Sequence, residues 1–397
     1  MINKRHHVIP YVIFVALLMV SLATFLVSII KVNPLISSIA SGVLILIMLL
    51  FVLANLQDIY LRRTNFVVKL IFPWVLFLWF NSVCFLGGQT WNNIIRAVCF
   101  QCGCLLIFLC YYIQGVSCSV ENFKANQRVF FVLTIFTVMF YAYEYVLGKR
   151  YTVDYAPVGF VLYLTMLLPW IALLNNKMLR YVLLAILSCL ALFSLKRSVL
   201  IQISIGGLFY VLIQSVIEGQ RKRTISMLVF PFALIGLWLI ISYVQEESSG
   251  MLFERLRLIS RDRGSGRLDI WAILWDEYKT WPFLNQIAGK GYYVTQVILK
   301  AYEAHNDFIE SLLSYGAIGF LADVCFSFYL LFKAIGIVLR KQPYAAAFTF
   351  GVISFWIVSL VSYNLYLMIW SLYLLAFLGY ICGIDQQEKD IYEYGLG

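Results

Sequence analysis

The chain alternates between long apolar runs and short polar joints, and this pattern predicts a bundle of membrane-crossing helices. Runs of about twenty apolar residues recur along the whole sequence, and each can cross ~30 Å of hydrocarbon as a helix. Backbone groups in lipid must be hydrogen-bonded within their own segment, which helices achieve. The expected spans, about 12 in number, are residues 8–30, 35–56, 66–86, 92–114, 128–147, 155–174, 179–195, 197–217, 225–243, 307–333, 344–362 and 365–383.

We therefore predict an all-α polytopic membrane protein, with residues 1–397 forming one integral membrane domain. Its largest polar interruption is the segment 245–306, between the ninth and tenth spans. Lys and Arg concentrate in alternate short joints, as expected when those joints face the cytoplasm. This bias predicts cytoplasmic termini and places segment 245–306 on the outer face of the membrane.

The composition agrees with a membrane protein and argues against a nucleic-acid-binding protein. The chain is 62% hydrophobic and 13% charged, whereas a soluble domain carries about 25% charged residues. The net charge of +10 could suggest nucleic-acid binding, but aromatic and basic residues are not interleaved, and basic residues at cytoplasmic helix ends account for the excess. Cys99, Cys102 and Cys104 lie in an apolar run, where small packing residues are expected rather than metal ligands.

Segment 245–306 carries a local patch of Arg. Five Arg residues between positions 255 and 267 face only Glu254 and Asp262, an excess of three (5 − 2). Over the whole segment eight Lys and Arg balance eight Asp and Glu, so the positive character is confined to the patch. Arg side chains grip phosphate oxygens bidentately. The patch therefore predicts an anion site, the alternative being simple contact with lipid phosphates.

A helix is expected directly after this patch. Gly264, Ser265 and Gly266 would let backbone N–H groups approach an anion at its start. The apolar residues of the following stretch share one helical face, as in a helix lying at a membrane interface. These residues are Ile270, Trp271, Leu274, Trp275 and Tyr278.

His305 stands at the outer mouth of the tenth span. Asn306 or Asp307 can cap the helix that follows, and Asp307 with Glu310 has the spacing of a capping box. A histidine titrates near neutrality, so His305 is a candidate general base at the water boundary. A zinc site would need Glu303, Asp307 or distant acids. A capping histidine without chemistry is the other alternative.

Three cations lie close to apolar runs. Lys196 and Arg197 separate the seventh and eighth spans, and Arg96 lies near the outer end of the fourth. Ionisable residues at such depth usually face a cavity or a partner, which favours a functional role for Arg197. Arg96 can equally extend to the outer headgroups.

An outer-face Arg patch, a lone His and many aromatic residues suit glycosyl transfer from a lipid-linked diphosphate. Arg stabilises the departing diphosphate, a base activates the hydroxyl acceptor, and sugars stack on aromatic rings. Several short stretches in this order resemble the bacterial O-antigen polymerase and O-antigen ligase superfamily. They are Ser194 to Ser198, Gly266 to Trp271, Gly289 to Tyr292, Ala304 to Glu310 and Tyr315 to Gly319.

The resemblance implies a metal-independent membrane glycosyltransferase with a GT-C-type bundle, no cofactor and an undecaprenyl-diphosphate-linked oligosaccharide as donor. Carried over to this chain, Arg197 and Arg267 would hold the pyrophosphate and His305 would be the catalytic base. Further pyrophosphate candidates are Arg263, Arg261 and Lys196, and the candidate acceptor or sugar ligands are Glu303, Asn306, Tyr292 and Trp271. The other expected partners are the lipid bilayer and a chain-length regulator protein.

The expected activity is that of an O-antigen or surface polysaccharide polymerase, which transfers the glycan to a hydroxyl of another lipid-linked repeat unit in lipopolysaccharide biosynthesis. The closest alternative is an O-antigen ligase, which uses the same donor but transfers the glycan to lipid A–core. A more distant alternative is a transporter or flippase for lipid-linked sugars, which would place charges on broken helices near the bilayer midplane. A non-catalytic scaffold is the third alternative.

Overall fold

The structure is a computed structural model that describes residues 9–28, 35–61, 66–84, 91–147, 159–192, 197–219, 266–292, 294–300, 304–362, 365 and 371–394. This part of the chain is all-α, as predicted. The first helices are α1 (Ile9–Ser28), α2 (Leu35–Ala54), α3 (Leu56–Leu61), α4 (Phe66–Cys84), α5 (Trp91–Val116), α6 (Val120–Leu147), α7 (Gly159–Ala172), α8 (Lys177–Leu192) and α9 (Arg197–Glu218). The remainder are α12 (Arg267–Lys279), α13 (Phe283–Ala288), α14 (Val294–Ile298), α15 (Asp307–Leu339), α16 (Ala345–Val361) and α17 (Ser371–Tyr394).

Every predicted span except 225–243 coincides with one of these helices, and 225–243 lies outside the described residues. Several helices are longer than the spans. Helix α6 begins at Val120, α15 continues to Leu339, and α17 continues to Tyr394. An apolar run marks only the part of a helix that can lie in hydrocarbon, whereas helical hydrogen bonding continues through polar turns beyond it.

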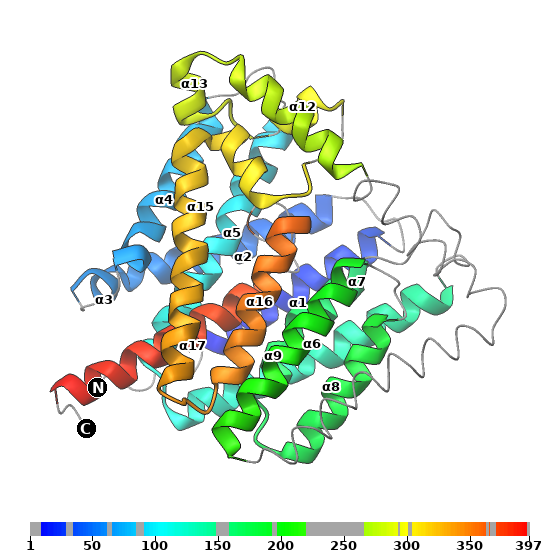
Figure 1. Cartoon of the computed structure of the whole chain (residues 1–397), viewed down its shortest axis with the longest axis vertical. Helices are drawn as coiled ribbons and strands as arrows, with labels where there is room; N and C mark the ends of the chain where they lie inside the picture. The colour runs from blue at the N-terminus through cyan, green and yellow to red at the C-terminus, as the bar shows by residue number, and fades with distance from the viewer. Residues whose placement is uncertain are drawn as a thin grey trace.

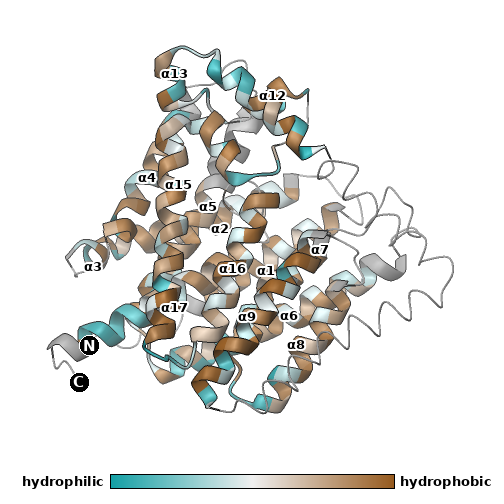
Figure 2. Cartoon of the chain, in the orientation of Figure 1, coloured by the Kyte–Doolittle hydropathy of each residue, from teal (hydrophilic) through white to brown (hydrophobic). Residues whose placement is uncertain are grey.

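Among the described residues, four stretches are long and apolar enough to cross a membrane. They are Ile36–Ala54, Val120–Tyr143, Ser198–Glu218 and Asp307–Leu339. Shorter apolar helices accompany them, and Figure 2 shows polar residues mainly on α12, α13 and the end of α17. These helices indicate a multi-pass membrane protein.

The outer surface of α2 supports this conclusion. Six apolar side chains repeat at intervals of three and four residues, and each is 41–58% exposed on the protein surface. A soluble protein does not leave such a continuous apolar stripe in water, whereas lipid accepts it. The stripe consists of Ile36, Ile39, Val43, Leu46, Leu50 and Leu53.

Contacts between distant residues show which helix termini share an end of the bundle. Arg340, just after α15, pairs with Asp385 on α17. Helix α7 runs parallel to α17, and the short turn after it brings the start of α8 to the same end. There Lys177 lies 3.1 Å from Glu218, the last residue of α9. We call this the Asp385 end. The starts of α9 and α15, with α12 and α13, lie at the opposite, His305 end (Figure 1).

Helix α17 is the centre of the bundle and packs in parallel against α5. Residues 371–386 are all buried. A methyl group on Gly379 would collide with the carbonyl oxygen of Phe108, and one on Gly383 with that of Tyr112. Gly115 of α5 is equally tight against α17. Because lipid tails are as apolar as the helices, close approach through small residues is a main source of helix association in membranes.

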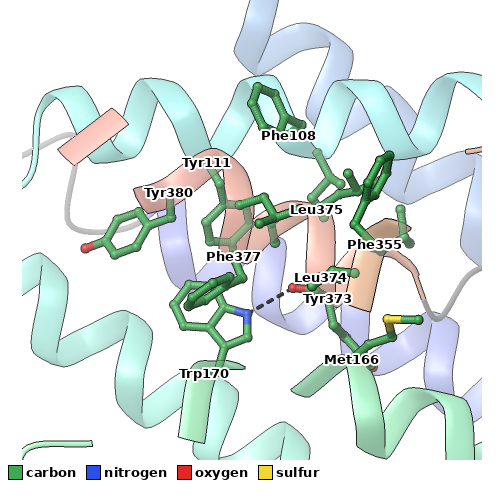
Figure 3. Packing of buried hydrophobic residues seen from close by; sticks show 14 of the residues in the cluster. Phe108, Tyr111, Met166, Trp170, Phe355, Tyr373, Leu374, Leu375, Phe377 and Tyr380 are labelled. Carbon is green, nitrogen blue, oxygen red and sulfur yellow. Dashed lines mark hydrogen bonds between the residues drawn. The ribbon is translucent and has the colours of Figure 1, made fainter. Parts of the chain in front are cut away.

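Aromatic rings fill the next layer around α17. The Trp170 indole of α7 stacks on Phe130 of α6, with ring centroids 3.7 Å apart, and its Nε1 donates to the Tyr373 carbonyl oxygen at 3.0 Å (Figure 3). Rings of Phe377 and Tyr380 lie against the same indole. These contacts bind α6 and α7 to the central helix.

A charged cluster closes the Asp385 end. The Asp385 carboxylate is 1% exposed and contacts Lys333 Nζ at 2.7 Å, the Arg340 guanidinium, and Lys389 Nζ at 3.6 Å. Burial would raise the pKa of the Asp385 carboxyl, but the cations Lys333, Lys389 and Arg340 outweigh burial and hold this pKa below its usual value. The ionised form therefore stabilises the fold.

The close contact of Gly379 with α5 predicts that one added methyl group will lower the stability of the protein. Gly379→Ala should lower the free energy of unfolding by about 1–3 kcal/mol, the usual cost of overpacking, because backbone atoms of α5 have no room to retreat. Gly42→Ala is the matched control, since a methyl group at Gly42 meets nothing within 4 Å. Thermal unfolding in detergent measures both. Equal stability of the two variants would contradict the role of this contact.

The Asp385 cluster predicts a pH dependence. Because the folded-state pKa of Asp385 is lowered, its stabilisation is present above the unfolded pKa of about 3.9 and is lost as pH falls through the folded pKa. Asp385→Asn should cost about 3 kcal/mol at pH 7, since it leaves buried Lys333 without its carboxylate. The gap between wild type and variant should narrow as the pH falls below the unfolded pKa of about 3.9 in unfolding measurements. A gap that is independent of pH would refute this account.

Candidate functional site

One hydrogen bond joins the two ends of the polar segment that precedes α15. The Trp271 indole Nε1, on α12, donates to the carbonyl oxygen of Ala304 at 2.8 Å. Arg267 lies one turn before Trp271 on the same helical face and is the first residue of α12. Ala304 is buried, and His305 follows it directly. The structure therefore brings the Arg267 end of α12 to the His305 backbone.

His305 has a backbone conformation that L residues rarely adopt. Its φ is 50°, in the left-handed region, and its side chain is half-buried. This conformation costs about 1–3 kcal/mol in a non-glycine residue and persists only where the surroundings impose it. Such strained residues are concentrated at functional sites. The residue before His305 is held by Trp271, so the strain is imposed from at least one side.

Asn306 holds the chain on the C-terminal side of His305. Its side chain caps α15, with Oδ1 accepting from the Ile309 N–H at 3.0 Å, and Nδ2 donates to the Leu360 carbonyl oxygen at the end of α16 at 3.0 Å. The prediction that Asn306 or Asp307 caps this helix is confirmed for Asn306. Residues on both sides of His305 are thus fixed to different helices, which defines where its side chain can lie.

Arg197 begins α9 at the same end of the bundle. Helices α9 and α16 pack against each other in opposite directions, and Gly206 of α9 lies against the Phe350 ring of α16. Arg197 precedes Gly206 by roughly 13 Å of helix and Leu360 follows Phe350 by roughly 15 Å, at 1.5 Å per residue. The Arg197 backbone is therefore level with Leu360, the partner of Asn306. Its side chain lies outside the described part of the structure.

Two glycine motifs fasten the polar segment to α15. Gly316 has φ 66° and interrupts α15, which leaves carbonyl groups of the preceding turn free. These groups accept from the Lys290 N–H at 3.1 Å and the Gly291 N–H at 2.9 Å. Side chains on Gly289 or Gly316 would collide with the opposite backbone. The two motifs contact each other through backbone, which explains why glycine is needed in both.

Two buried carboxylates lie beneath this connection. Asp307 is fully buried and accepts from the Leu365 N–H at 3.3 Å. Glu310 is 2% exposed, and its two oxygens accept from Thr295 Oγ1 at 2.8 and 2.9 Å. The capping-box interpretation of Asp307 and Glu310 is therefore wrong, because each carboxylate binds another segment. Sequence reasoning did not identify Thr295, since a threonine fifteen residues away carries no local signal.

The apolar face of α12 packs on protein and is not open to a membrane interface. Leu274 is fully buried with Trp281, Val294 and Leu313, and Ile270 and Tyr278 pack against the same small core. Only Trp275 of this predicted face is largely exposed, at 53%. The prediction of an interfacial helix is thus wrong for most of the face. A second apolar element, α15, was near enough to cover it.

The other predicted site residues are either engaged in packing or lie outside the described residues. Trp271 acts here through its bond to Ala304, and Tyr292 is 6% exposed, so its ring packs beneath the surface. Arg96 belongs to α5 at the His305 end, with its side chain outside the described part. Lys196, Arg261, Arg263 and Glu303 lie outside the described residues.

No group of three His, Cys, Asp or Glu side chains within the described ranges is arranged to hold a metal ion. The described site offers at least the chemistry of its own side chains. A guanidinium at Arg267 can bind an anion, and an imidazole at His305 can accept a proton. Both groups start from backbone that hydrogen bonds hold in place.

Trp271→Phe should loosen the His305 segment without emptying the space beneath α12. It removes the donor to a buried carbonyl group, so the free energy of unfolding should fall by about 1–3 kcal/mol, and amide hydrogen exchange across residues 304–309 should accelerate. Trp275→Phe makes the same chemical change at an exposed position of α12 and should leave exchange unchanged. Equal exchange in both variants would show that the bond does not hold His305.

Comparison of the sequence with protein-family models and with curated proteins finds no match. The function is therefore argued from the arrangement of the residues themselves. The residues that bear on function are an arginine and a histidine at one end of an apolar helical bundle.

Proposed function

We propose that the chain is a membrane glycosyltransferase of the GT-C type that polymerises a surface polysaccharide. The observation that carries the proposal is the hydrogen bond from Trp271 to Ala304, which links α12, whose first residue is Arg267, to the residue before the strained His305. In this proposal about 12 helices cross the bacterial inner membrane, and the segment 245–306 faces the periplasm.

The distribution of basic residues supports this orientation. Most described Lys and Arg residues outside 266–300 are at the Asp385 end, which would then be cytoplasmic by the positive-inside rule. At the His305 end, apart from Arg96 and Arg197, the described cations belong to the segment 266–300. The cations of the Asp385 end are Lys69, Lys124, Arg128, Lys177, Arg180, Lys333, Arg340, Lys341 and Lys389.

The proposed donor is an oligosaccharide linked to undecaprenyl diphosphate, whose lipid remains in the bilayer. The diphosphate would lie at the membrane surface against Arg267 and Arg197, whose forked guanidinium groups fit phosphate oxygens. Arg261, Arg263 and Lys196 are further candidates for the same anion. Arginine is always charged and lysine is ordinarily charged at neutral pH, so these cations can stabilise the departing diphosphate without transferring a proton.

The reaction would proceed by substitution at the sugar. The imidazole of His305 accepts the proton of the acceptor hydroxyl, the acceptor oxygen bonds to the anomeric carbon, and the bond from that carbon to the diphosphate oxygen breaks. The leaving group is undecaprenyl diphosphate. In the polymerase the acceptor is a second lipid-linked repeat unit, with Glu303, Asn306 and Trp271 as its proposed ligands. A chain-length regulator protein is a proposed partner.

An O-antigen ligase is the second candidate, because it would use the same donor and the same three residues. The two activities differ only in the acceptor. Purified protein incubated with lipid-linked repeat units alone separates them. Long lipid-linked chains indicate the polymerase, whereas a product that requires added lipid A–core indicates the ligase.

Arg267→Ala and His305→Ala should each abolish chain growth in cells or with purified lipid-linked repeat units, because one removes the diphosphate's counter-charge and the other the base. Arg267→Lys should also be strongly impaired if bidentate binding matters, since a lysine offers only a point charge. Gel analysis of the glycolipids measures chain length, and membrane levels of each variant must equal wild type.

Lys279→Ala is the matched control on the same helix. Lys279 pairs with Asp276 at 2.7 Å on an exposed surface, away from the Trp271 contact, and its loss should leave polymer length unchanged. Full-length polymer from either Arg267→Ala or His305→Ala would refute the proposed roles.

A further inference from the structure

The Asp385 end holds a group of cations that its own carboxylates do not fully use. Three basic side chains surround the Asp385 carboxylate, namely Lys333 at 2.7 Å, the Arg340 guanidinium, and Lys389 at 3.6 Å. Lys333 is nearly buried, whereas Arg340 and Lys389 have side chains 39% and 41% exposed. The single negative charge of Asp385 does not neutralise three cations.

The neighbouring charges leave this excess in place. Glu388 accepts a hydrogen bond from the Tyr344 hydroxyl at 2.8 Å, and Asp390 accepts one from Gln386 at 2.9 Å. Counting also the exposed Lys341, four cations meet three carboxylates, an excess of one (4 − 3). Lys389 lies 3.6 Å from Asp385, a long contact, and its side chain is 41% exposed. The Lys389 side chain can therefore be reached by a ligand from outside the protein.

The pKa of Lys389 is lowered from its usual value. Burial lowers this pKa, and the charges of Lys333 and Arg340 lower it further, against the attraction of Asp385. Two neighbouring cations thus act against the positive charge of Lys389, while Asp385 acts in its favour. An anion placed between Lys389 and Arg340 would relieve this repulsion.

The shape of α15 shows where such an anion would come from. Four apolar side chains form an outward stripe on this helix, Phe328, Phe332, Ile335 and Leu339, exposed by 42, 65, 48 and 76%. Gly336 lies between this stripe and the basic side chains, and a methyl group built on it meets only Arg340, at 3.4 Å. The surface is therefore open from the apolar stripe to the cations.

We propose that this surface binds the headgroup of an anionic phospholipid. Acyl chains would lie along the α15 stripe, and the phosphodiester would sit over Gly336 between Arg340 and Lys389. Basic pockets between transmembrane helices recognise such headgroups, each nearby cation adding to the attraction. The proposal needs only the membrane and does not depend on the glycosyltransferase proposal.

The test measures the thermal unfolding midpoint of the full chain in detergent against added lipid. Phosphatidylglycerol should raise the midpoint in a saturable, salt-sensitive manner, whereas phosphatidylcholine with the same acyl chains should not. Lys389→Gln should weaken the apparent affinity about fivefold, the effect expected for one basic residue near an anionic headgroup. Gly336→Leu should weaken it too, by filling the open surface without changing charge.

Lys279→Gln at the His305 end removes the same charge elsewhere and should keep the full phosphatidylglycerol effect. Equal stabilisation by phosphatidylcholine would overturn the proposal, as would an unchanged affinity in Lys389→Gln. An equal shift with inorganic phosphate alone would overturn it as well, by showing a site for soluble anions. If Gly336→Leu does not fold, Lys389→Gln decides alone, since its side chain is 41% exposed and can be replaced without disturbing the core.

Discussion

The close contact between α5 and α17 is the constraint on which the rest of the bundle depends. Gly379 and Gly383 let the two backbones approach until no methyl group could fit between them. In lipid, helices gain little from simply hiding apolar surface, so such contacts and interhelical hydrogen bonds supply much of the association. Once α17 is fixed, Trp170 and Tyr373 position α7 on it, and its far end holds α15 through Asp385.

The packed helices hold the candidate site in a fixed geometry. His305 is strained, yet its two neighbours are held by hydrogen bonds to residues 33 and 54 positions away in the sequence. Rigid helices at both ends of those bonds prevent the segment from relaxing. The same principle joins the glycine motifs around Gly289 and Gly316, where backbone meets backbone. A site of this kind is positioned by the bundle and not by its own loop.

The two ends of the bundle differ in which charged side chains they hold and in what those side chains contact. At the Asp385 end, basic side chains outnumber the carboxylates that they contact, which suits a surface near anionic headgroups. At the His305 end, the acidic residues Asp307 and Glu310 are buried and bind backbone or hydroxyl groups of the chain. These two side chains hold neighbouring segments to the start of α15, and Arg267 is the first residue of α12.

The sequence by itself determined the helices, because an apolar run must be helical in lipid and because caps act locally. It placed nearly every span, the capping role of Asn306 and the start of α12 close to Arg267. It did not determine which side α12 would bury, the partners of Asp307 and Glu310, or the strain at His305. Those follow from contacts over 15 to 58 residues of separation. Only the packed structure brings such residues together, since periodicity along a chain carries no information about its distant neighbours.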